Sequence, residues 1–169
     1  MSTMRAIRIE KITLNVGAGK DQTMLEKGMK LLKILTGIDP IKTYTHKRVP
    51  SWGLRPGLPI GTKITIRDTT KIKDLLERTL KAKEMKLPKS CFDAQGNVAF
   101  GIHEYIDIPG LDYDPAIGIM GFQVCITLER PGFSIKKQRI KREVGKKHLI
   151  SQEDAIAYMK EAFKVEVTE

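Results

Sequence analysis

The amino-acid sequence predicts an α+β fold: a mainly antiparallel sheet, helices packed on one face of it, and a long loop between the second and third strands. Two patterns predict this arrangement. Several segments alternate apolar and polar side chains, as strands with one buried face do, and three others repeat apolar residues at helical spacing. The expected order is strand, helix, strand, loop, strand, helix, two strands, basic tail and helix. Helices on one sheet face are the simplest packing for that order.

The expected strands leave one face of the sheet polar. The first strand, residues 6–16, alternates apolar with polar side chains, so that one side is buried and the other meets solvent or a ligand. Further strands are expected at residues 40–47, 60–67, 97–108 and 118–129. The side chains expected on the open side are those of Thr13, Asn15, Lys63, Thr65, Arg67 and Thr127.

The first expected helix follows the first strand. Asp21 is placed to cap its N-terminus, and Gly37 is placed to end it. Gly28 lies inside the helix at a cost of about 1 kcal/mol relative to Ala. We therefore expect a close approach between this helix and its neighbour at Gly28.

Two more helices are expected farther along the chain. One begins at Asp68 or Thr69 and fades before Pro88. The last opens at Ser151, where Asp154 three residues later completes a capping-box pattern.

The segment between the second and third strands is predicted to be an exposed loop, because its prolines and glycines disfavour regular structure. Long loops in compact domains are usually functional or disordered. The loop carries the basic residues Lys47, Arg48 and Arg55 and the only tryptophan, Trp52. This indole must either pack back onto the domain or stack on an external group, and the residues alone leave both open.

A run of basic residues follows the last expected strand. Between residues 135 and 148 only Glu143 opposes seven cations. A packed core cannot use such a run, so it is either a solvated face or a contact for phosphates, and its density favours phosphates. The seven cations are Lys136, Lys137, Arg139, Lys141, Arg142, Lys146 and Lys147.

The length and the charge of the chain limit the class of protein to which it can belong. The 169 residues suffice for a single domain over 1–169, with a core at 6–130 and a basic tail with a C-terminal helix at 131–169. Thirty Lys and Arg oppose twenty Asp and Glu. A nucleic acid would account for this excess, since each neutralised phosphate releases a counterion, but many small domains are basic without a specific partner, and an anionic membrane surface is a weaker alternative. No stretch reaches the roughly 18 apolar residues of a membrane span, so we expect a cytoplasmic protein without a membrane partner.

No metal, disulfide or cofactor is expected. Cys91 and Cys125 are the only cysteines, and neither has a second cysteine or a histidine at ligand spacing. The three histidines, His46, His103 and His148, are far apart in the sequence.

Two weaker hypotheses would make the chain an enzyme. The Gly17–Lys20 turn between a strand and a helix invites a nucleotide-binding interpretation, but its spacing fails. A dinucleotide site needs Gly at Gln22, and a phosphate loop needs Ser or Thr at Asp21. The carboxylates between residues 107 and 114 could hold a cation or act as a base, but no motif surrounds them. A binding protein without catalysis is the favoured interpretation.

Three segments resemble the L-five family of large-subunit ribosomal proteins, over nearly the whole chain and in order. The distinctive motifs are LNVGAG, the strand entry PIG-x-K-x-T, and GNVAFGIHEYIDIPGLDYD. The tail GFSIKKQRIKREVGKKH is more similar to the archaeal and eukaryotic branch than to the bacterial one. The segments are IRIEKITLNVGAG, GIDPIKTYTHKRVPSWGLRPGLPIGTKITIR and FDAQGNVAFGIHEYIDIPGLDYDPAIGIMGFQVCITLERPG.

The resemblance implies a function for each of these surfaces. In the family the sheet side binds 5S ribosomal RNA and nearby large-subunit RNA, and the loop reaches transfer RNA in the P site. Neighbouring ribosomal proteins, including a bridge protein of the small subunit, are further partners, and the family is not enzymatic. The implied 5S RNA contacts are Thr13, Asn15, Thr43, Thr45, Lys63, Thr65 and Arg67, and the implied transfer RNA contacts are Lys47, Arg48, Trp52 and Arg55.

Overall fold

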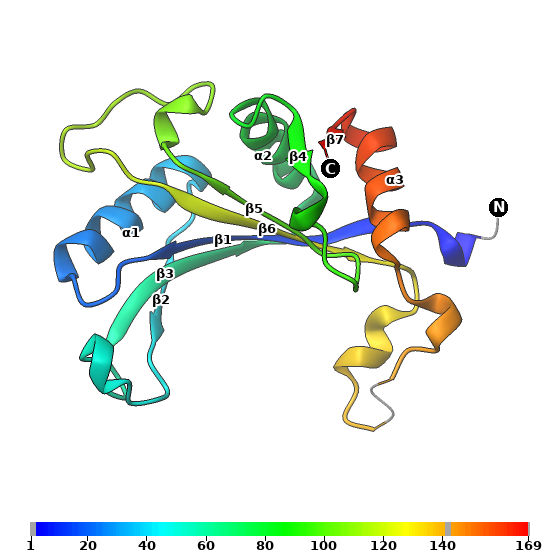
Figure 1. Ribbon diagram of the computed structural model, residues 1–169, viewed down its shortest axis with the longest axis horizontal. Coiled ribbons are helices and arrows are strands. Elements are labelled where there is room, and N and C mark those ends of the chain that lie inside the picture. Colours follow the sequence, from blue (N-terminus) through cyan, green and yellow to red (C-terminus); the bar gives the residue numbers. More distant parts are fainter. Residues whose placement is uncertain (1–2, 141–142, 169) are drawn as a thin grey trace.

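The computed structural model describes residues 3–140 and 143–168. Five antiparallel strands form one sheet in the order β2-β3-β1-β6-β5. Helices α1 (Gln22–Thr36), α2 (Thr69–Lys81) and α3 (Gln152–Phe163) lie on one side of it (Figure 1), which confirms the predicted α+β fold. The strands are β1 (Arg8–Gly17), β2 (Ile41–Tyr44), β3 (Pro59–Ile66), β5 (Val98–Ile102) and β6 (Phe122–Glu129).

The core lies between the sheet and the helices. Ile12 and Leu14 of β1 are fully buried, as are Leu32 of α1 and Leu76 of α2. The predicted alternation is confirmed over residues 12–16 of β1, residues 62–66 of β3 and the whole of β6, where every second residue is buried and the residues between them are less so. One side of each strand therefore faces the helices, and the other remains available.

The helix ends follow the predicted chemistry with one exception. The Asp68 carboxylate accepts from the amide of Thr70, and Ser151 and Asp154 form the reciprocal capping box of α3. Gly37 ends α1 in the left-handed conformation. Asp21 occupies the N-cap position of α1, but its side chain makes no capping hydrogen bond, so that part of the prediction was wrong.

Gly28 brings α1 onto the sheet, as predicted. A Cβ at this position would lie 2.9 Å from Cγ1 of Val16 and 3.3 Å from Cγ2 of Thr62. Because Val16 belongs to β1 and Thr62 to β3, the missing side chain sets how closely the helix approaches both strands.

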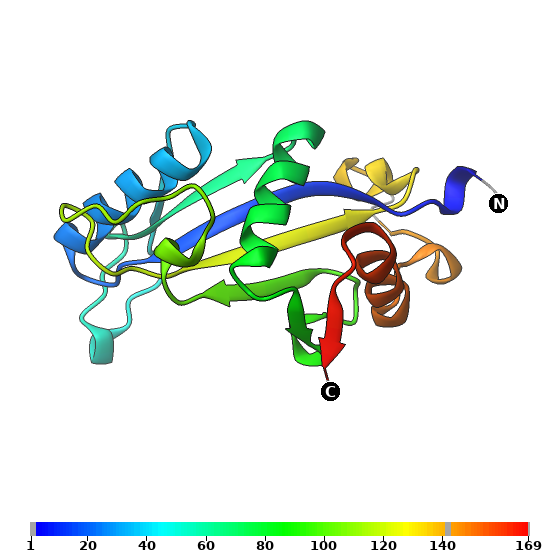
Figure 2. The same ribbon diagram turned by 90° about the horizontal axis from the view of Figure 1, so that it is seen from above.

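Several boundaries differ from those expected. The second strand ends at Tyr44 rather than near residue 47, and the strand expected over 97–108 stops at Ile102 and gives way to a single 3-10 turn at Tyr105–Asp107. Two short strands, β4 (Lys86–Pro88) and β7 (Glu166–Thr168), were not expected at all. These two pair in parallel beside α3, as seen from above in Figure 2.

Two projections extend from the side of the sheet that the helices leave open (Figure 1). One is the loop between β2 and β3. It was expected to lack regular structure, yet it contains a 3-10 turn at Pro50–Trp52, closed by pairing of Val49 with Leu54. The other comprises residues 131–140 and 143–148, with short 3-10 turns at Phe133–Lys137 and Lys146–His148. We call the side between the projections the open face.

Candidate nucleic-acid interface

Strand register places the predicted polar residues together on the open face. Thr13 lies directly between Thr65 on β3 and Cys125 on β6. Asn15 lies between Lys63 and Gln123 on the same strands, and its amide donates to the Gln123 side chain at 3.4 Å. Paired residues of adjacent strands share a face. The central three strands therefore present one continuous surface of hydroxyls, amides and cations.

The two threonines predicted on the second strand differ in their surroundings. Thr43 pairs with Gly61, two residues before Lys63, and so belongs to the open face. Thr45 lies beyond the end of β2, and its hydroxyl donates to the carbonyl of Leu58 at 2.8 Å. Thr45 therefore closes the base of the loop and is not part of the sheet surface.

Positive charge gathers around one carboxylate at the edge of the open face. Glu10 pairs with the ammonium of Lys137 at 2.8 Å. Burial raises the pKa of Glu10, but the hydrogen bond from Lys137 and the charges of Lys11, Lys137 and Arg67 outweigh it and hold the pKa below its ordinary value. Four charged groups from β1, the end of β3 and the basic segment thus meet at one place.

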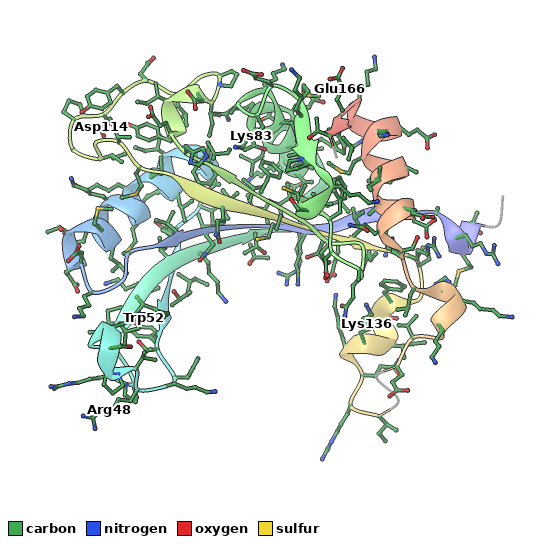
Figure 3. The ribbon with its side chains drawn as sticks, viewed as in Figure 1. Arg48, Trp52, Lys83, Asp114, Lys136 and Glu166 are labelled. Carbon is green, nitrogen blue, oxygen red and sulfur yellow. The ribbon has the colours of Figure 1, made fainter. Side chains whose placement is uncertain are left out.

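The projecting loop presents its basic residues and its indole to the outside. Lys47, Arg48 and Arg55 are exposed. Trp52 is 67% exposed, so of the two alternatives open from the sequence, packing back onto the domain is not the one observed. Figure 3 shows Arg48 and Trp52 on the same projection, away from the helices. The loop offers an exposed apolar ring and exposed cations on one projection, groups that are suited to stacking on bases and to contacting phosphates.

The basic segment 131–148 is partly bound to the rest of the chain. Lys136 lies over the ring of Phe133 at 4.4 Å, and Lys137 is held by Glu10. Arg139, Lys146 and Lys147 are exposed. The two remaining predicted cations, Lys141 and Arg142, lie outside the described residues.

Cations lie on both projections that border the open face. In Figure 3, Arg48 and Lys136 lie on the two projections, whereas the helix side carries both signs of charge, with Lys83, Asp114 and Glu166. The polar face that lacks a helix cover is therefore also the face with basic rims, which is the arrangement expected for contact with a polyanion.

The Gly17–Lys20 turn does not have the geometry of a nucleotide site. The amides of Ala18 and Gly19 both donate to the carbonyl of Ile60, at 2.9 and 3.0 Å. A phosphate loop directs such amides at its ligand, whereas here they attach the end of β1 to the start of β3. The turn is structural, as the failed spacing predicts.

The other polar groups weighed for catalysis also have structural explanations. The Asp114 carboxylate accepts from the amide of Ala116, and the Asp114 amide donates to the hydroxyl of Tyr105. Burial raises the pKa of both thiols, Cys91 and Cys125, which disfavours the reactive thiolate. Within residues 3–140 and 143–168, no group of three or more His, Cys, Asp or Glu is arranged to hold a metal. In the same part of the chain, no helix is long and apolar enough to cross a membrane.

Three residues of the interface are absent from the predicted contacts. Gln123 and Lys11 belong to the open face, but they lie in ordinary strand alternation, and only the register shows that they adjoin the predicted residues. Glu10 lies beside a β-bulge in β1, where pairing with β6 shifts between Ile9 and Lys11. Alternation alone assigns Glu10 to the wrong side of the sheet because a bulge inserts one residue.

Comparison with known proteins identifies the family. The family model described as "Ribosomal protein L5" matches residues 2–55, and the model for the C-terminus of the same ribosomal family matches residues 59–158. The chain belongs to the ribosomal protein L5 family. As a member of this structural family it is not an enzyme.

Archaeal members of the L5 family resemble the chain over nearly its full length. A protein named "Large ribosomal subunit protein uL5" from Nanoarchaeum equitans is 46% identical, covering 97% of each chain. Proteins of the same name from Sulfolobus acidocaldarius and Methanococcus vannielii are 41% and 39% identical. They cover 99% and 97% of this chain and 94% and 92% of their own lengths. These relatives confirm the resemblance to the archaeal branch.

Proposed function

We propose that this structural protein of the large ribosomal subunit binds 5S ribosomal RNA through its open face. The observation that carries the proposal is that face itself, where Thr13, Asn15, Lys63 and Thr65 form one surface without a helix over it. The face has no paired aromatic rings, so phosphates, 2′-hydroxyls and overall shape dominate recognition. Counterion release supplies much of the affinity, and the fixed hydroxyls and amides set the register.

The two projections serve separate RNA partners in this proposal. The loop with Lys47, Arg48, Trp52 and Arg55 contacts transfer RNA in the P site, because its cations and its exposed indole stand clear of the sheet. The segment 131–148 contacts neighbouring large-subunit RNA through its exposed cations. Neighbouring ribosomal proteins, including one at the bridge to the small subunit, are the other partners in this proposal.

Binding of the purified protein to transcribed 5S RNA over a range of salt concentrations tests the first part. We expect the logarithm of the association constant to fall steeply and linearly with the logarithm of salt. Lys63→Ala should reduce the magnitude of this logarithmic slope by about one, because one phosphate contact is lost. Lys73→Ala, an exposed residue of α2 on the helix side, is the matched control and should leave the slope unchanged. Binding that is insensitive to salt would refute the proposal.

A further inference from the structure

A hollow of about 780 Å³ opens on the open face beside the basic segment. Strands β5 and β6 form its floor, the turn at 89–97 forms one wall, and the 3-10 turn at Phe133–Lys137 contributes the other. Figure 1 shows both walls descending on the side opposite α1 and α2. The volume falls within the range of about 300–1,000 Å³ typical of sites for organic ligands.

Short side chains make the floor. Ala99 on β5 pairs with Cys125 on β6, and Thr127 follows on the same side of β6. At comparable positions of the sheet, Lys63 and Arg67 carry long side chains away from the backbone. A flat ligand can therefore approach the backbone at Ala99 without displacing a side chain.

The charges of the walls distinguish between parts of a nucleotide. Lys136 and Lys137 line one side, whereas Asp93, Glu10 and Glu129 also border the hollow. The carboxylates repel a phosphate from the interior, while the lysines attract it to the rim. An uncharged base with hydrogen-bond donors on its edge suits the interior better than the RNA backbone does.

Among the three carboxylates, Asp93 is the one least engaged. Glu10 pairs with Lys137 at 2.8 Å and Glu129 pairs with Arg8 at 2.7 Å. Among the residues that the structure describes, the exposed Asp93 carboxylate accepts one long hydrogen bond, of 3.4 Å, from the side-chain amide of Asn97. Its two oxygens can accept two parallel N–H bonds. Guanine is the one standard base with two adjacent donors, N1–H and the N2 amino group, on its Watson–Crick edge.

We propose that this hollow receives one unpaired guanosine of the bound RNA. The base lies over Ala99 and Cys125, its Watson–Crick edge donates to Asp93, and the flanking phosphates lie at Lys136 and Lys137. The inference rests on the proposed binding of 5S RNA by the open face and adds a base-specific contact to it. Bases extruded from loops and bulges are the usual elements through which proteins read RNA sequence.

Chemical probing of the complex tests this inference. Kethoxal modifies the N1 and N2 positions of unpaired guanosines, so 5S RNA is treated with it alone and with each protein. The wild-type protein should protect one guanosine. Ala99→Leu, which fills the floor, should abolish that protection and weaken binding about tenfold. Asp93→Asn, an exposed change that removes a carboxylate without altering shape, should also abolish it. Ala157→Leu on the exposed side of α3 is the matched control.

The outcomes separate this inference from the function on which it rests. If the wild-type protein binds 5S RNA with the expected salt dependence but Ala99→Leu and Asp93→Asn bind and protect equally well, the guanosine site is wrong and the open-face interface stands. If the wild-type complex protects no guanosine, the site is again wrong. If the wild-type protein does not bind 5S RNA, both proposals fall together. Thermal unfolding of each variant, expected to match the wild type, excludes misfolding as the cause of lost protection.

Discussion

Arg130 and Asp154 form an ion pair, with 2.9 Å between the guanidinium and the carboxylate, that joins the end of β6 to the first turn of α3. The same guanidinium donates to the carbonyl of Leu149 at 3.1 Å. Because Arg130 precedes the basic segment and Leu149 follows it, one buried side chain holds both ends of that segment. His148 reinforces the closure through a 2.9 Å hydrogen bond to the carbonyl of Pro131.

Replacing Arg130 tests this anchor. We expect Arg130→Ala to lower the free energy of unfolding by roughly 2 kcal/mol, because the carboxylate and carbonyl that it contacts lose a charged donor. Urea unfolding measures the loss. Arg139→Ala, an exposed arginine of the same segment, should change stability by less than about 0.5 kcal/mol. Equal urea unfolding midpoints for Arg130→Ala and Arg139→Ala would show that Arg130 does not anchor the basic segment.

The pKa of Glu10 makes the stability of the protein depend on pH. In the folded state this pKa is lowered from its ordinary value of 4.5, so ionised Glu10 stabilises the fold above that pH. The contribution is lost as pH falls through the folded pKa. Glu10→Gln should therefore be less stable than the wild type at neutral pH and lose that difference in acid. Unfolding measured from pH 7 to pH 3 tests this, with the exposed Glu77→Gln as control. A difference that persists unchanged at pH 3 would contradict it.

Gly28 sets a limit on the size of the side chain between α1 and the sheet. Alanine is a better helix former by about 1 kcal/mol, but its Cβ would lie 2.9 Å from a methyl group of Val16 in the core. We expect the clash to dominate and Gly28→Ala to destabilise the protein by roughly 1 kcal/mol net. At Gly101 a Cβ meets nothing within 4 Å, so Gly101→Ala should not destabilise. Thermal unfolding distinguishes the two, and a stabilised Gly28→Ala would show that the helix can shift.

Trp52 is the only tryptophan and can therefore report on the loop without a label. Its fluorescence should be quenched by transfer RNA, because the exposed indole stacks on a base in the proposed contact. An excess of 5S RNA should leave the signal nearly unchanged, since the sheet lies away from the indole. Trp52→Ala should weaken transfer RNA binding while changing stability by less than about 0.5 kcal/mol. Quenching by 5S RNA but not by transfer RNA would show that the loop contacts 5S RNA instead.

The sequence predicts the layer structure because alternation and helical spacing are local properties. Ile12 and Leu14 mark the buried side of β1 without reference to any other strand, and Ser151 with Asp154 marks the start of α3. The short strands β4 and β7 were not predictable. A strand of three residues is too short to show a hydrophobic period, and the two strands that pair lie about eighty positions apart in the sequence.

The interface was predictable only in part, because some of its features depend on how distant segments pair and not on local sequence patterns. Alternation predicts the positions of Thr13, Lys63 and Thr65, whereas the direction of Glu10 depends on a bulge that exists only in the pairing of β1 with β6. The resemblance to the L5 family supplied the identity of the RNA partners, which periodicity does not encode. The hollow could not be predicted, because its floor and walls come from three separate parts of the chain.

The glycine turn after β1 has a consequence for the arrangement of the RNA contacts. Its amides donate to the carbonyl of Ile60, and the exposed side chain of Lys20 lies against Gly53 of the projecting loop. The turn therefore contacts both the start of β3 and the loop that carries Trp52, while it continues directly from β1, the strand of Thr13 and Asn15. The proposed transfer RNA contact and the proposed 5S RNA contact are thus neighbours through a single turn of the chain.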